Sequence, residues 1–203
     1  MKRKKIYFVV FLIVLIFSCS FSTVYAHGVG GQAYFGSSGD GVTSIYADIK
    51  IPNYPYVPTS AGSCAWPLIT GSGGSNSFYV QVGWWKMNAL NIHTGIYYFY
   101  EINYGTANND YQVYSTTGPA ANSTHGYRVS LITVGSNKYF SGSVDGTTIA
   151  NYNRIWNGIT YKGTGVQFYE ELNGNNATSA HFAGSLSSPA IFANLRAFYN
   201  GYT

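Results

Sequence analysis

The sequence predicts an all-β protein, a single antiparallel β-sandwich, on three observations. Only 9% of the 203 residues are charged while 18% are aromatic, which disfavours long amphipathic helices, coiled coils and charged disordered tails. The chain has 24 Gly and 20 Tyr, and its apolar runs are short and separated by Gly, Asn and Ser clusters. Runs and turns at this spacing are typical of sandwiches and barrels.

Eight segments have the alternation or the aromatic and β-branched content of strands. They are residues 44–51, 77–85, 95–104, 111–116, 127–134, 137–144, 165–172 and 179–186. One short helix is expected near Ile149 to Trp156. The chain has no internal repeat of fixed period.

The first 26 residues read as a secretory signal peptide. A basic start, MKRKK, precedes the apolar run IYFVVFLIVLIF, which is too short to span a bilayer comfortably, and Val24-Tyr25-Ala26 is a small-residue cleavage pattern. We expect cleavage after Ala26, secretion, and one domain over residues 27–203 with no membrane attachment. Cys19 leaves the alternative of a lipidated cysteine, although Phe17 fits such a site poorly.

The net charge of +4 belongs to this leader. Its first five residues hold four of the 11 Lys and Arg, so the rest of the chain has 7 basic (11 minus 4) and 7 acidic side chains. A neutral chain offers nucleic acids and anionic membranes no electrostatic reason to bind.

Cysteine and histidine usage indicates no metal site. Cys64 is the only cysteine after the leader, so no intrachain disulfide is expected, and we interpret it as a small buried side chain. The histidines, His27, His93, His125 and His181, are scattered and favour loop or surface positions over a zinc site or a catalytic triad. No cofactor is predicted.

Alternation divides three predicted strands into an apolar face and a mixed face. The apolar sets are Val80, Val82 and Trp84, then Ile96, Tyr98, Tyr100 and Ile102, then Val166, Phe168 and Leu172. The mixed sets contain Tyr79, Gln81 and Gly83, then Tyr97, Phe99, Glu101 and Asn103, then Gln167, Tyr169 and Glu171. We predict that the mixed faces together line a groove, and we note that Glu170 falls on the apolar side.

Glutamate is scarce, and Glu101, Glu170 and Glu171 all lie in aromatic strand contexts. Burial among rings raises the pKa of a carboxyl group, which suits a group that takes and returns a proton. The structural alternative is that these carboxylates block strand-edge pairing or accept hydrogen bonds.

Residues 61–195 resemble the glutamic peptidase (eqolisin) family. The segment CAWPLITGSGGSNSFYVQVGWW is similar to that family's tryptophan segment and glutamine strand, at Trp66 and Gln81. The block YYFYEINY resembles its aromatic strand with a central glutamate, at Glu101, and VQFYEELNGNNATSAHFAGSLSSPAIF resembles its later glutamate strand, at Glu171. At Pro67-Leu68-Ile69-Thr70 the chain departs from the family, which usually has Gly and Asp there.

The plant neprosin family is a related resemblance. Gln81-Val82-Gly83-Trp84 is similar to its first glutamate strand, with Gln replacing Glu, and its second glutamate again falls on Glu171. A β-bulge would let Glu170 replace Glu171, so Glu170 is the second choice. Both families imply a concanavalin-like or lectin-like jelly roll with a concave groove. The groove residues would be Trp66, Tyr79, Phe99, Glu101 and Tyr169.

The resemblance implies an endopeptidase that cleaves polypeptides at acid pH without metal or cofactor. Glu171 would act as general base and then acid on a water, and Gln81 would polarise that water and stabilise the oxyanion. The competing hypothesis is a non-catalytic carbohydrate-binding or adhesive β-sandwich, whose aromatic face, with Trp84, Trp85 and Trp156, stacks on sugar rings.

Overall fold

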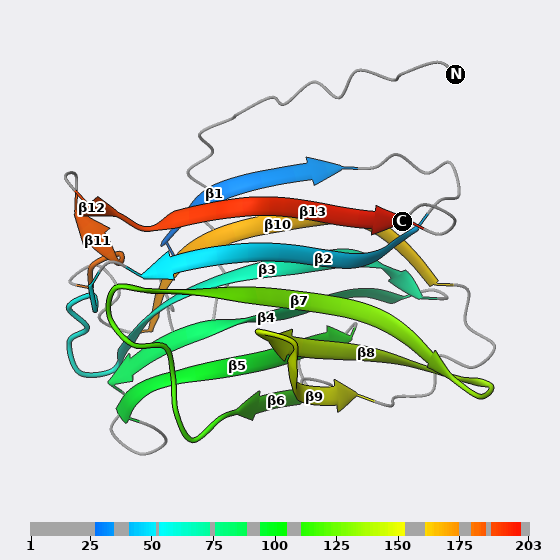
Figure 1. Cartoon of the computed structure of the whole chain (residues 1–203), viewed down its shortest axis with the longest axis horizontal. Helices are drawn as coiled ribbons and strands as arrows, with labels where there is room; N and C mark the ends of the chain where they lie inside the picture. Colours follow the sequence, from blue (N-terminus) through cyan, green and yellow to red (C-terminus); the bar gives the residue numbers. More distant parts are fainter. Residues whose placement is uncertain are drawn as a thin grey trace.

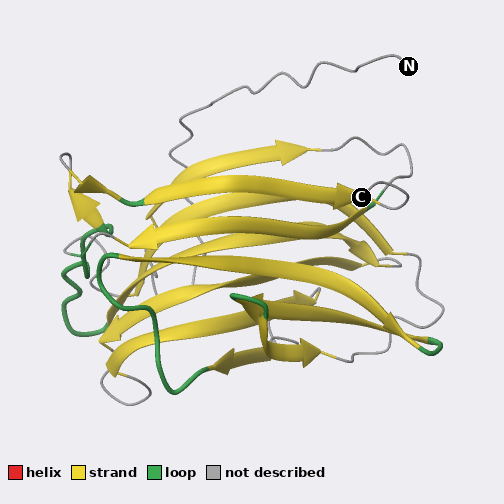
Figure 2. Cartoon of the chain, viewed as in Figure 1, coloured by secondary structure: helices red, strands yellow, loops and turns green. Residues whose placement is uncertain are grey.

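The computed structural model describes residues 27–34, 41–51, 53–73, 76–88, 94–104, 111–152, 161–174, 180–185 and 188–199. Within these ranges the chain consists of strands joined by loops and turns (Figure 2). The predicted signal peptide with Cys19, as well as His93 and Trp156, lies outside the described residues. The described residues contain no helix with the length and apolar character needed to cross a membrane.

Two antiparallel sheets form the layers of a sandwich, which confirms the predicted fold class (Figure 1). The six-stranded sheet has the order β1 (His27–Tyr34), β10 (Tyr161–Gly174), β3 (Ala61–Gly73), β4 (Asn76–Asn88), β5 (Thr94–Tyr104) and β6 (Tyr111–Tyr114). The five-stranded sheet has the order β13 (Ile191–Tyr199), β2 (Val42–Ile51), β7 (Ser123–Val134), β8 (Asn137–Val144) and β9 (Thr147–Tyr152). A small ribbon pairs β11 (Gly184–Ser185) with β12 (Ser188–Pro189).

The main core lies between the two sheets and follows the predicted alternation. Val80, Val82 and Trp84 of β4 are fully buried in it, together with apolar side chains of β2, β7 and β8 from the facing sheet. Tyr100 of β5 also donates a hydrogen bond to the backbone carbonyl of Phe140 in β8, at 3.1 Å. The apolar sets read from the sequence therefore mark the inner face of the six-stranded sheet.

Residues 61–73 form a full strand, β3, which the strand prediction does not include. Every residue from 61 to 69 is buried, because β3 has apolar neighbours on both faces, so it shows no alternation of polar and apolar residues. The β3–β4 ladder has no pair at Trp66 and Pro67, where proline has no N–H to donate.

The predicted helix at 149–156 is wrong over its described part. Residues 147–152 form β9, which follows β8 through a two-residue turn. Asp145 and Gly146 in this turn both have positive φ, 50° and 78°. An Asp-Gly pair of this kind is a strong hairpin signal, because both central residues of a type I′ turn need positive φ.

The strand predicted at 179–186 is also wrong over residues 180–183. The N–H groups of His181 and Ala183 donate instead to the backbone carbonyl of Tyr56 and to the side chain of Glu170. The chain enters β11 only at Gly184.

Three further strands, β1, β12 and β13, were not predicted. β1 is rich in glycine, with the sequence HGVGGQAY. In β13 the register shifts between Ala193 and Arg196, around Asn194 at a φ of 51°, and this bulge interrupts the alternation.

Candidate active site on the outer face of the six-stranded sheet

Strand alternation directs the predicted site residues to the outer face, the face of the six-stranded sheet turned away from the five-stranded sheet. Gln81 of β4 and Glu101 of β5 each lie between two core residues and therefore point outward. We define the outer-face cluster as the buried residues Cys64, Trp66, Leu68 and Phe99 with Tyr79, Trp85, Tyr114 and Tyr169 packed against them. The predicted groove residues thus share one face.

Gln81 is held by a short hydrogen-bond chain. Its Nε2 donates to Oε2 of Glu101 at 2.9 Å, and the hydroxyl of Tyr79 donates to Oε1 of the same carboxylate at 2.6 Å. Gln81 and Glu101 are cross-strand partners and are 7% and 6% exposed. The pairing turns the amide oxygen of Gln81 away from the carboxylate and fixes the orientation of the amide.

Glu171 forms a second polar centre on the same face. Trp66 donates its indole N–H to Oε2 of Glu171 at 3.3 Å, and its ring stacks on Tyr169 with centroids 5.4 Å apart. Burial raises the pKa of Glu171, and repulsion from Glu101 adds to that rise, while hydrogen bonds from Trp66 and Asn173 oppose it. Glu171 can therefore hold a proton at a higher pH than an exposed glutamate.

The two predicted catalytic residues lie on the same face of the sheet but in different rows, where a row is a line of residues paired side by side across neighbouring strands. On β3, Leu68 is the partner of Gln81, and Cys64 is the partner of Glu171. Four residues of β3 thus separate the two rows, about 13 Å at about 3.3 Å per residue. Trp66 lies between the rows, and the carboxylate hydrogen-bonded to Gln81 is that of Glu101.

Glu170, the second choice for the catalytic acid, points to the inner side. It is 5% exposed and accepts the backbone N–H of Ala183, a residue of the main core. The irregularity in β10 falls between Gly163 and Gly165, so no bulge turns Glu170 outward. Burial raises the pKa of Glu170 to about 7, although the hydrogen bond from the Ala183 N–H opposes this rise.

Aromatic rings of the outer-face cluster lie over glycines of the sheet. A Cβ added to Gly83 would meet the backbone oxygen of Ala65 at 2.1 Å, Cβ of Trp66 at 2.8 Å and the Phe99 ring at 2.9 Å. One added to Gly62 would meet the indole nitrogen of Trp85 at 2.3 Å. Glycine at these positions lets the rings lie close to the backbone.

We expect Gly83→Ala to destabilise the fold by about 1–3 kcal/mol, the usual cost of overpacking, because the backbone of β3 would have to move. Urea unfolding followed by tryptophan fluorescence measures this. The control is Ser77→Ala, an exposed position on the same strand, which should change the free energy of unfolding by less than about 0.5 kcal/mol. Equal stability of Gly83→Ala and the wild type would contradict the close packing of Gly83 against Ala65 and Trp66.

We expect Trp66→Phe to raise the pKa of Glu171 further, because the substitution removes a hydrogen bond that stabilises the ionised carboxylate. The chain contains only three glutamates, so NMR of protein labelled with carboxyl-13C glutamate resolves the titration directly. The Glu170 resonance, from the opposite face, is the internal control. A fall or no change in the Glu171 midpoint would show that the indole does not act on this group.

Cys64 and Trp85 complete the row that contains Glu171. Cys64 is 2% exposed, and burial raises the pKa of its thiol well above the usual value, which fits the predicted small buried side chain. The Trp85 indole nitrogen is buried without a hydrogen-bond partner in the described part of the chain. The outer-face positions of Leu68 and Tyr114 were not predicted. Of the tryptophans named for sugar stacking, Trp85 lies on the outer face, two residues after Gly83 on β4, whereas Trp84 is fully buried in the main core, so that expectation was wrong for Trp84.

No protein-family model and no curated protein matches the chain. Among solved structures it is similar to scytalidoglutamic peptidase, bound to a peptide-based transition-state analogue, with a TM-score of 0.51 and 13% identity over 89% of this chain and 83% of that one. A tetrameric galectin from the ball sponge Cinachyrella sp. gives a TM-score of 0.44 and 14% identity over 84% and 100% of the two chains. An endo-1,3-beta-glucanase from Streptomyces sioyaensis gives a TM-score of 0.45 and 14% identity over 83% of this chain and 68% of that one. At this identity the resemblance to the glutamic peptidase is one of fold.

Proposed function

We propose that the chain is a secreted, metal-independent hydrolase of the glutamic endopeptidase kind, which cleaves polypeptides at acid pH on the outer face. The observation that carries the proposal is the gathering of Gln81, Glu101 and Glu171 on one aromatic face of a sandwich. The distant fold likeness to a glutamic peptidase supports it.

Glu171 is the general base and acid in this proposal. Both oxygens of Glu101 already accept short hydrogen bonds, from Tyr79 and Gln81, so that carboxylate serves to position the amide. Glu171 has a raised pKa and a longer bond from Trp66. It takes a proton from water as the water attacks the scissile carbonyl, and it returns that proton to the leaving amine.

Gln81 is the electrophilic partner, and its role requires substrate. The amide has a second N–H besides the one given to Glu101, and this N–H can donate to the oxyanion that forms at the scissile carbonyl. Because the two rows are offset along β3, the proposal requires the side chains of Gln81 and Glu171 to turn toward the same peptide bond when a peptide lies across Trp66.

The direct test is hydrolysis of an unfolded protein by the purified chain. We expect cleavage between about pH 2 and 6, the range in which carboxyl groups titrate, and we expect it to persist with a metal chelator. Mass spectrometry of the products gives the cleaved bonds, and N-terminal sequencing of the secreted protein checks removal of residues 1–26. Absence of cleavage across this range would remove the peptidase proposal.

Carbohydrate binding is the second candidate, and the outer-face cluster is the observation that favours it. The aromatic rings of this cluster are suited to stacking on the faces of sugar rings. Calorimetric titration with oligosaccharides tests this. A sugar-binding protein should retain its affinity in Glu171→Gln without cleaving any polypeptide.

A further inference from the structure

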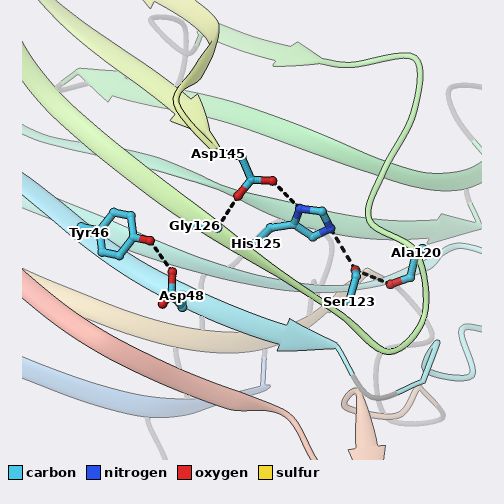
Figure 3. Close-up of polar contacts among 7 residues, drawn as sticks. All are labelled: Tyr46, Asp48, Ala120, Ser123, His125, Gly126 and Asp145. Carbon is cyan, nitrogen blue, oxygen red and sulfur yellow. Dashed lines mark hydrogen bonds and ion pairs between the residues drawn. The ribbon is translucent and has the colours of Figure 1, made fainter.

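A hydrogen-bonded chain of serine, histidine and aspartate lies away from the outer face, at the start of β7 (Figure 3). Oδ2 of Asp145 is 2.6 Å from Nδ1 of His125, and Nε2 of His125 is 2.9 Å from Oγ of Ser123. His125 is one of the four histidines that lie scattered along the sequence and was expected at a loop or surface position, whereas it belongs to β7. Asp145, 20 residues further along the chain, reaches it from the turn between β8 and β9.

The aspartate in this chain is held in its ionised form. Its Oδ1 accepts the backbone N–H of Gly126 at 2.8 Å, and its own N–H donates to the carbonyl of Gly126. Partial burial raises the pKa of Asp145, but the hydrogen bonds from His125 and Gly126 outweigh it, so the pKa lies below its usual value. The carboxylate thereby fixes Nδ1 of His125 as a donor and turns Nε2 toward Oγ of Ser123.

The imidazole is also fixed from the side. The ring of Tyr98, from β5 in the other sheet, meets the His125 ring edge-on with centroids 5.6 Å apart. The His125 side chain is 21% exposed and that of Asp145 is 54% exposed, so reagents can reach the chain of residues from solvent. Nucleophile, base and orienting carboxylate thus have the connectivity that activates a serine.

We propose that Ser123 is an activated nucleophile that accepts one acyl or phosphonyl group from a donor with a good leaving group. Its hydroxyl donates to the Ala120 carbonyl, and Nε2 of His125 lies 2.9 Å from the same Oγ, so a turn of the O–H bond directs the proton to Nε2 (Figure 3). In the reaction the Oγ proton passes to Nε2 and the Oγ–acyl bond forms. The bond to the leaving group breaks, and that group departs with its electron pair and is protonated from Nε2.

The site forms a stable ester and does not turn over rapidly. The backbone N–H groups of Asn122 and Ser123 already donate to the carbonyls of Ile51 and Ala120, at 2.7 and 3.2 Å. They are not available to stabilise an oxyanion, and this lowers the rate of both acylation and hydrolysis. The modification is therefore stoichiometric.

The test is labelling of the full chain with a fluorophosphonate, in which the Oγ–phosphorus bond forms and fluoride leaves, followed by peptide mass spectrometry. We expect one adduct, on Ser123, that is absent in Ser123→Ala and forms about 10²-fold more slowly in His125→Gln. Asp145→Asn should also slow it, and it should fold normally because Asn-Gly suits the type I′ turn. An adduct elsewhere, no adduct, or equal rates in Asp145→Asn and the wild type would overturn the proposal.

Glu171→Gln separates this site from the proposed peptidase site. The two sites belong to different sheets and share no described hydrogen bond, so Glu171→Gln should label at the wild-type rate. A loss of labelling in Glu171→Gln would contradict the independence of Ser123.

Discussion

Glu171→Gln is expected to lower the rate of peptide-bond cleavage at acid pH by about 10²- to 10⁴-fold, the usual contribution of a general acid–base group. Glutamine keeps the shape of the side chain and can still accept the indole N–H of Trp66, so the outer face should stay intact. It can neither take a proton from water nor return one to the leaving amine. The measurement is kcat/KM on a fluorogenic peptide between about pH 2 and 6.

The neighbouring residue supplies a matched control. Glu170→Gln makes the same chemical change one residue away on β10 but on the inner side, and its amide oxygen can still accept the Ala183 N–H. It should leave kcat/KM within about twofold of the wild type, because Glu170 at acid pH is already neutral. If Glu170→Gln is inactive and Glu171→Gln is active, the assignment of the catalytic residue is wrong.

Glu101→Gln identifies which carboxylate does the chemistry. The substitution keeps an acceptor for Gln81, and the Tyr79 hydroxyl can reverse its direction to accept from the new amide. If Glu101 only positions Gln81, Glu101→Gln should lower kcat/KM much less than Glu171→Gln does. Its kcat/KM should also keep the decrease that the wild type shows on the acid side of the pH profile. If this decrease disappears in Glu101→Gln and in no other variant, the general base is Glu101 and not Glu171.

The largest expected effect on stability is a pH dependence that Glu170 gives to the fold. Its pKa is about 7 in the folded protein against 4.5 for the free group, so the folded state binds the proton more tightly than the unfolded state. The resulting stabilisation is complete below about pH 4.5 and is lost as the pH rises through about 7. The difference in pKa corresponds to about 3 kcal/mol, at about 1.4 kcal/mol per unit.

Glu170→Gln should therefore be about as stable as the wild type at pH 4.5 and up to about 3 kcal/mol more stable at pH 7, because glutamine has no charge to bury. Urea unfolding at the two pH values measures the difference. Glu171 also has a raised pKa, so Glu171→Gln is the companion variant that reports its share of the slope. A wild-type stability that rises from pH 4.5 to pH 7 would contradict this account of Glu170.

Alternation along the chain predicted much of the fold and the direction of most site residues. In β4, β5 and β10 one face is core and the other mixes aromatics with Gln or Glu, so a period of two assigned Val80 inward and Gln81 outward from the residues alone. The same rule failed for β3, which is buried on both faces, and for residues 180–183, whose N–H groups bond to a side chain and a loop.

By itself the sequence determined the sandwich and the outer face, because side-chain direction in a strand depends only on position along that strand. The pairing register between strands decided the rest, since it depends on how separate segments align in the folded chain. It paired Gln81 with Glu101, set Glu171 four residues away along β3, kept Glu170 inside, and closed the turn that carries Asp145 to His125. Alternation along a single strand contains no information about these pairings, because each one depends on which segment of the folded chain lies alongside.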